Sequence, residues 1–208
     1  MGWLKVDSAA EAIARLNPDV RVVRHPERLA ASNAIGIMSR YDVIVAGVDD
    51  FPTRYLVNDA SLHLRKPVVH ASVLRFEGQL TVVLPYRGPC YRCLFPEPPP
   101  PELAPSSIDA GILGAVPGVI GSAQAAEAIK LLLGIGEPLV GRLFCYDALC
   151  GEGRILAVRR DPQCAACGDE RRPPPVVDYD RSCLPAGPGG GAAGPFGAAF
   201  GGFGVPGS

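Results

Sequence analysis

Two short cysteine pairs, far apart in the sequence, constrain this chain more than any other feature. They are Cys90 with Cys93 and Cys164 with Cys167, each in the spacing C-x-x-C. Each pair can present two thiolates to one metal ion, and two pairs complete a tetrahedral Cys₄ shell with no position left for water or substrate. The sequence therefore predicts one structural zinc site that joins distant parts of the chain.

Disulfide bonds and redox chemistry are the two alternatives to zinc for these cysteines. A disulfide framework is the main one, but the N-terminus lacks the apolar stretch and small-residue cleavage site of a secretory signal. A redox C-x-x-C is disfavoured as well, because neither pair opens a helix directly after a strand.

Length, composition and charge narrow the class of protein. The chain has 208 residues, 48% of them hydrophobic, and a formal net charge of −1. It is long enough for one substantial core, and it shows no electrostatic preference for nucleic acid or for an anionic membrane. Gly, Pro or charge interrupts every apolar run before the ~20 residues that a membrane span needs. We therefore expect a cytoplasmic globular protein that binds neither nucleic acid nor membrane.

Helical and strand patterns alternate before the first cysteine pair. Apolar periodicity after a capping-box spacing at 8–11 predicts a helix on the core, and further helices are expected over 27–39 and 51–65. Strands are expected at 20–23, 41–47 and 67–71, and antiparallel strands over 73–84, broken by Gly78. The run at 41–47 is typical of a parallel strand buried on both faces. The predicted fold is α/β, a Rossmann-like doubly wound sheet followed by an antiparallel region.

Asp49 and Asp50 directly follow the strand expected at 41–47. Ligands of open α/β sheets bind at the carboxyl edge of the strands, so two carboxylates there suggest a Mg²⁺-nucleotide site. Helix capping explains them equally well, because an Asp before Phe51 can accept backbone N–H bonds at the start of the next helix. The two roles can be divided between the neighbours.

Longer motifs resemble the MoeB/ThiF family of ubiquitin-like-protein-activating enzymes, over about residues 2 to 183. They are GWLKVDSA at 2–9, GVDDFPTRYLVN at 47–58, EGQ at 77–79, PCYRCLFP at 89–96, DAGILG at 109–114, PGVIGSAQAAEAIK at 117–130, YDA at 146–148 and CAACGD at 164–169. The resemblance implies an enzyme that uses ATP and Mg²⁺ to adenylate the C-terminal glycine of a ubiquitin-fold sulfur-carrier protein, releasing pyrophosphate. Family members are commonly homodimers, so the resemblance also implies a homodimer.

The resemblance assigns roles to individual residues. Lys5 matches the lysine of the family's G-x-x-K-V-E-S-A motif, which contacts ATP phosphates. Asp49 matches the aspartate of the T-D-N motif, which holds Mg²⁺ and the reacting phosphate, and Asp50 stands at the Asn position as a further candidate nucleotide contact. Cations placed against developing charge accelerate such transfers. For Arg54 and Asn58, which match the following R-x-x-x-N, a supporting structural role is preferred.

The departures from the family pattern are also informative. Family members begin with a strand, a G-x-G-G-L-G turn and a helix that wrap the nucleotide phosphates, and this part has no counterpart here. We therefore expect residues 1–183 to form an adenylation domain without its N-terminal glycine-loop half, supplied by an upstream segment or another polypeptide. A non-catalytic, zinc-containing carrier-binding remnant is the alternative. A dinucleotide-dependent oxidoreductase is disfavoured, because no G-x-G-x-x-G opens a βαβ unit.

Three further expectations concern the second half of the chain. The glycines at 111, 114, 118 and 121 are interpreted as a close-packing device and not as a phosphate loop. Ser107 stands where some family members carry a reactive cysteine, so we expect no covalent sulfur handling there. Residues 184–208 are nearly all Gly, Ala, Pro and Phe, which predicts disorder.

Overall fold

A computed structural model describes residues 2–98 and 110–179. The expectations for Ser107 and for residues 184–208 lie outside these ranges. The helices are α1 (Lys5–Leu16), α2 (Ala31–Met38), α3 (Phe51–Leu64), α4 (Tyr91–Leu94) and α6 (Ala115–Leu133). The strands are β1 (Ile44–Ala46), β2 (Val68–Leu74), β3 (Glu77–Val83), β4 (Arg142–Asp147) and β5 (Glu152–Ala157).

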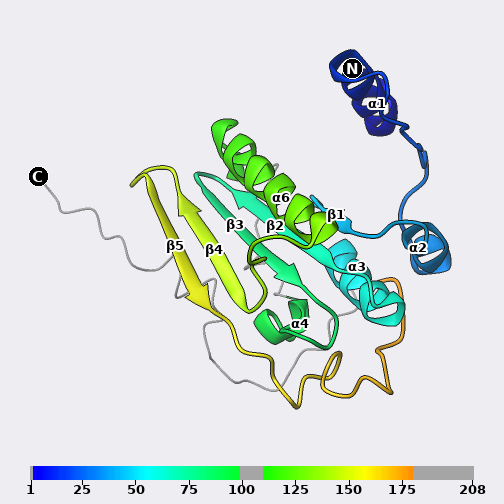
Figure 1. The fold of residues 1–208 in the computed structure, drawn as a ribbon, viewed down its shortest axis with the longest axis vertical. Coiled ribbons are helices and arrows are strands. Elements are labelled where there is room, and N and C mark those ends of the chain that lie inside the picture. Colours follow the sequence, from blue (N-terminus) through cyan, green and yellow to red (C-terminus); the bar gives the residue numbers. More distant parts are fainter. Residues whose placement is uncertain (1, 99–109, 180–208) are drawn as a thin grey trace, which may run out of the picture.

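The strands form one open sheet in the order β1-β2-β3-β4-β5 (Figure 1). β1 and β2 are parallel, and Val45 lies opposite Val69. The other neighbouring pairs are antiparallel. The predicted α/β class with an antiparallel C-terminal region is confirmed.

Helices cover both faces of the sheet, because successive residues of a strand point to opposite sides. Val68 packs with Leu56 and Ala60 of α3 in one core. Val69 packs in a second core, against which Ala123 of α6 lies. This two-sided arrangement is that of the predicted doubly wound fold, and it puts α3 and α6 on either side of the carboxyl ends of β1 and β2.

The N-terminal helix differs from its prediction. α1 begins at Lys5, ahead of the predicted Ser8, and its N-cap, Leu4, makes no side-chain capping bond. No residue of α1 is buried, and Leu16 is 87% exposed. The expected apolar face therefore contacts no core, because α1 lies apart from the sheet (Figure 1).

The next three predicted elements are also shorter or absent. Residues 20–23 form no strand, and the valines there are exposed, since no other described strand pairs with them. The helix expected at 27–39 is limited to α2. β1 has three residues instead of seven, and Val45 is 52% exposed. It pairs only with β2 among the described strands, so burial on both faces is wrong for this strand.

The predictions for α3 and for the antiparallel strands after it are largely confirmed. α3 has Pro52 in its first turn, where proline is tolerated because that N–H has no helical partner. β2 and β3 form the expected antiparallel pair. Gly78 does not interrupt it: the residue lies within β3, and a Cβ atom there would come within 2.3 Å of Cγ1 of Ile120 in α6.

The close-packing interpretation of the glycines at 111, 114, 118 and 121 is wrong. Cβ atoms added at these four positions would meet no atom of the described residues within 4 Å. The close approach of α6 to the sheet is made through Gly78 of β3 instead.

One expectation about membranes also needs correction. The 19 residues of α6 are long and apolar enough to cross a membrane by length and composition, although 22% of this segment is buried in the protein. Core helices pass the same test, and α6 packs on β2 and β3. The expectation that no apolar run approaches the length of a span is nevertheless wrong for this helix.

Candidate functional site

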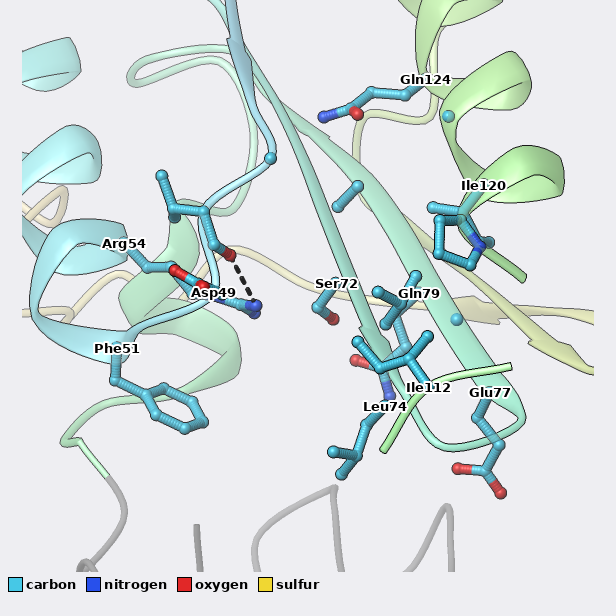
Figure 2. Close-up of a pocket in the computed structure, with 17 residues that line it drawn as sticks. Asp49, Phe51, Arg54, Ser72, Leu74, Glu77, Gln79, Ile112, Ile120 and Gln124 are labelled. Atoms are coloured by element: carbon cyan, nitrogen blue, oxygen red, sulfur yellow. Dashed lines mark hydrogen bonds between the residues drawn. The ribbon is translucent and has the colours of Figure 1, made fainter. Parts of the chain in front are cut away.

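A cavity of about 230 Å³ lies at the carboxyl ends of β1 and β2. Figure 2 shows Asp49, Phe51 and Arg54 on one side of it and Ile120 and Gln124 of α6 on the other. The β2–β3 hairpin forms the wall between them. This is the sheet edge at which ligands bind in open α/β folds.

The two neighbouring aspartates have different positions. Asp50 is the N-cap of α3: its Oδ1 accepts from the backbone N–H of Thr53 at 2.9 Å, and the Thr53 hydroxyl lies 2.8 Å from each carboxylate oxygen. Asp49 lines the cavity, and no hydrogen bond or ion pair to another described residue engages its carboxylate. The nucleotide-contacting roles of both residues stay predictions, and the capping role of Asp50 is confirmed.

Lys5 is not brought to this cavity. It is the first residue of α1, it is exposed, and it is absent from the cavity wall. Its predicted contact with ATP phosphates would require α1 to lie elsewhere.

Arg54 lies directly beside Asp49. Its Nη2 donates to the carbonyl oxygen of Val48 at 3.0 Å, and its guanidinium lies 5.5 Å from the centre of the Phe51 ring. No ion pair joins Arg54 to a carboxylate in the described parts of the chain. Asn58 is fully buried, and its Oδ1 accepts from the backbone N–H of Tyr91 at 2.9 Å, which is the supporting contact predicted for it.

The four predicted metal ligands come together from α4 and its N-cap and from the loop at 164–168. The Sγ atoms of Cys90, Cys93, Cys164 and Cys167 all lie within 4.8 Å of one another. Sγ–Sγ distances are 4.0 Å from Cys90 to Cys93, 3.7 Å from Cys90 to Cys164 and 3.4 Å from Cys93 to Cys167. A tetrahedral zinc ion with bonds of about 2.3 Å holds its sulfurs about 3.8 Å apart. The donor set and spacing fit zinc, and all four thiols are free, which contradicts the disulfide alternative.

The backbone of the second cysteine pair is folded tightly. Gly168 donates its N–H to the carbonyl of Cys164 at 2.8 Å, and a Cβ atom at Gly168 would lie 2.6 Å from the Pro162 carbonyl oxygen. The Arg160 guanidinium donates to the carbonyl of Cys167. These contacts fix the direction of the two thiols.

An ion pair between the first cysteine pair and α3 was not predicted from the sequence. Arg92, inside the first C-x-x-C, binds fully buried Asp59 of α3 through Nε at 3.1 Å and Nη2 at 3.0 Å. The Tyr179 hydroxyl also donates to Asp59, and burial together with this bond raises the pKa of Tyr179 to about 12. The only signal in the sequence was a charged residue within a metal-binding motif.

A second unpredicted cluster lies between the cysteines and the cavity. The ring of His70 in β2 stacks on Tyr91 of α4, with centroids 5.0 Å apart. His70 is 5% and Tyr91 3% exposed. Burial, and then the charge of Arg54, lower the pKa of His70 to about 3, so this imidazole is neutral at physiological pH.

Comparison with known proteins identifies the family. The model of the ThiF family matches residues 1–166. A sulfur carrier protein adenylyltransferase of Thermus thermophilus is 50% identical over 188 residues, which cover 88% of this chain and 69% of the relative. Adenylyltransferase and sulfurtransferase MOCS3 of Bos taurus is 48% identical over 183 residues, 88% of this chain but 40% of the relative.

A solved structure supports the fold. The ATP complex of MccB from E. coli superposes with a TM-score of 0.67 at 18% identity, over 79% of this chain and 51% of that protein. The chain therefore spans about half the length of this structure and between 40% and 69% of the two curated relatives. The sequence motifs, the open sheet and these matches agree: the chain belongs to the ThiF family.

Proposed function

We propose that this chain takes part in the ATP-dependent adenylylation of the C-terminal glycine of a ubiquitin-fold sulfur-carrier protein. The observation that carries the proposal is the position of Asp49: its carboxylate lines the cavity at the carboxyl end of β1 and is engaged by none of the residues that the structure describes. The names of the two curated relatives, both adenylyltransferases, support the same reaction.

We assign two charged groups of the cavity to the reaction. Mg²⁺ would be held by Asp49 and would neutralise charge on the phosphate oxygens. Arg54 supplies the nearby positive charge. Asp50 contributes by fixing the start of α3, which keeps the preceding Asp49 in place.

The other expected features are proposals of the same kind. Zinc is structural here, because four thiolates leave no open coordination position. A cytoplasmic location fits four free thiols within reach of one another, since reducing conditions keep them available for metal. A homodimer and the contribution of Lys5 belong to the proposal as well.

Carrier-dependent exchange of labelled pyrophosphate into ATP tests the function. We would measure it with the chain as given and with a version extended by the glycine-rich segment that the resemblance predicts. Asp49→Asn should lower the exchange rate by roughly 100-fold or more in whichever version is active, since it removes the metal-binding charge. The matched control is Asp42→Asn, at the opposite end of β1, whose side chain is 90% exposed. Equal rates for Asp49→Asn and the control would overturn the assignment.

A non-catalytic carrier-binding role is the second candidate, and the position of Lys5 on exposed α1 favours it. It predicts carrier binding without exchange in both versions of the chain. Calorimetric titration with the carrier, run beside the exchange assay, separates the two functions.

A further inference from the structure

Three buried polar atoms without a well-formed hydrogen bond occur in one region of the protein. They are Nε of Arg54, Nε2 of His70 and the hydroxyl of Tyr91, and none has such a bond to the described residues. A buried polar atom left unpaired is costly, so such atoms are rare and typically serve a purpose. The three come from α3, β2 and α4.

Contacts and charge place these side chains together. His70 and Tyr91 are stacked, and the charge of Arg54 contributes to the lowered pKa of His70. Burial raises the pKa of Tyr91, and the nearby Arg54 guanidinium partly offsets that rise. Arg54 reaches the cavity wall, while the two rings, both more than nine-tenths buried, lie behind it. Of the three side chains, only the Arg54 guanidinium therefore reaches the cavity, and the rings of His70 and Tyr91 lie in the interior.

The charge of Arg54 has no carboxylate partner among the described residues; its neighbours there are a carbonyl and an aromatic face. Arg54 is half-buried, and charges partly removed from water are commonly paired, because desolvation is costly. His70 adds no second charge, since it is neutral, and so leaves the guanidinium as the single cation among the described residues of this wall.

We propose that Arg54 binds an anionic oxygen of the reactants in the cavity, and that Tyr91, stacked on His70, is a positioning residue that holds its guanidinium. The inference rests on the proposed function for the identity of the reactants, which offer two such oxygens: a phosphate oxygen of ATP or pyrophosphate, and the C-terminal carboxylate of the carrier. The supporting structural role preferred for Arg54 from the sequence is thereby extended to ligand binding.

Asp49 and Glu77 also line the cavity, so an incoming anion meets two carboxylates there. Glu77 lies on the hairpin, across the cavity from Arg54 and Asp49 (Figure 2). An anion accompanied by Mg²⁺ on Asp49 would be accepted beside Arg54. The subsite should therefore bind magnesium pyrophosphate more strongly than metal-free pyrophosphate.

Calorimetric binding to the whole chain, without turnover, tests this subsite. The probes are pyrophosphate with Mg²⁺, pyrophosphate alone, and a short peptide that ends in Gly-Gly with a free carboxylate. Arg54→Gln should weaken binding of one probe by about 10- to 100-fold, the value of a charge-assisted hydrogen bond, and the affected probe identifies the oxygen. Arg54→Lys should restore part of the affinity, because it keeps the charge without the planar fork.

The positioning role of Tyr91 needs its own test and control. Tyr91→Phe should weaken binding several-fold and also increase its dependence on salt, because a loosened guanidinium binds mainly through charge. The matched control is Tyr55→Phe, whose hydroxyl donates to the Phe95 carbonyl in the same aromatic cluster. Arg65→Gln is the control for Arg54. Arg65 caps the other end of α3 and also packs on an aromatic ring, 5.0 Å from the centre of Tyr86, but it lies outside the cavity wall.

The outcomes separate this subsite from the proposed function. The inference is overturned if the folded wild-type chain binds none of the three probes, or if Arg54→Gln and Arg54→Lys both bind as the wild type does. Thermal unfolding of each variant shows whether it is folded. If Arg54→Gln does not fold, the binding of the three probes to Arg54→Lys decides whether the inference stands. Loss of pyrophosphate exchange with intact Arg54-dependent binding would contradict only the proposed function.

Discussion

Asp49 and Asp50 are neighbours in the sequence but have different roles in the structure. Asp50 is used by the fold as the cap of α3, whereas Asp49 faces the cavity. Asp50→Ala should therefore lower the free energy of unfolding by about 0.5–2 kcal/mol, the usual value of an N-cap. Asp49→Ala should leave it within about 0.5 kcal/mol, as surface changes do. Urea unfolding of the two variants checks this, and equal losses would show that the roles are not divided.

His70 makes a second prediction at the level of one residue. Burial and the nearby charge of Arg54 keep its pKa near 3 in the folded protein, well below the ordinary value of about 6.5. Below pH 6.5 the unfolded chain therefore binds a proton that the folded chain does not, and stability falls as the pH drops from 6.5 toward 3. Above pH 6.5 this contribution is fully present.

His70→Gln should reduce this acid-induced loss, so its unfolding free energy should change less than that of the wild type between about pH 7 and about pH 5. The matched control is His25→Gln, whose ring bonds the Tyr41 hydroxyl on an exposed part of the chain. The measurement is denaturant unfolding at several pH values. Parallel curves for His70→Gln and wild type would contradict the assignment.

At the level of elements, the two cysteine pairs stabilise two short segments that would not keep their structure alone. α4 has only four residues, too few for a helix to persist alone. The cluster joins it to the loop at 164–168. Zinc should be present at about one equivalent, and its removal should cost a large part of the fold's stability, on the order of 10 kcal/mol for small zinc domains.

Metal analysis and thermal unfolding, with and without a chelator, test the zinc site. Cys93→Ser together with Cys167→Ser should abolish zinc binding and lower the melting temperature. Cys150→Ser is the matched control, because that cysteine is exposed and outside the cluster. Full zinc content in the double variant would rule out this ligand set.

The elements also show that a sequence predicts local features better than contacts between distant segments. α3 and the cysteine cluster were predictable because Pro52, Asp50 and the C-x-x-C spacing act locally. The strand expected at 20–23 failed because a strand also needs a neighbour, which the valine-rich pattern does not reveal. The cluster of Arg54, His70 and Tyr91 could not be predicted, since its members come from three elements and only the fold brings them together.

At the scale of the whole molecule, one ion pair joins α3, α4 and the segment that follows the second cysteine pair. Asp59 is fully buried and accepts from Arg92 and Tyr179. Arg92→Leu should destabilise the protein by about 3–5 kcal/mol, because it leaves a buried carboxylate without its cation. Adding Asp59→Leu to that variant should recover part of the loss, and urea unfolding of both single variants and of the double variant measures this. A loss in the double variant equal to the sum of the two single losses would show that the pair is not coupled.

The amide of Gln124 has a consequence for how this protein can vary between species. From α6 its Nε2 donates to the backbone carbonyls of Ala46 at 3.0 Å and Val69 at 2.9 Å, and so ties the helix to two neighbouring strands. Because the contact is made to backbone, any apolar side chain of suitable size can replace those at 46 and 69 without breaking it. Position 124 has no such freedom, since a carboxylate cannot donate and a hydrocarbon would leave the carbonyls without this donor. Natural variation should therefore be broad on the strands and narrow at this one helical position.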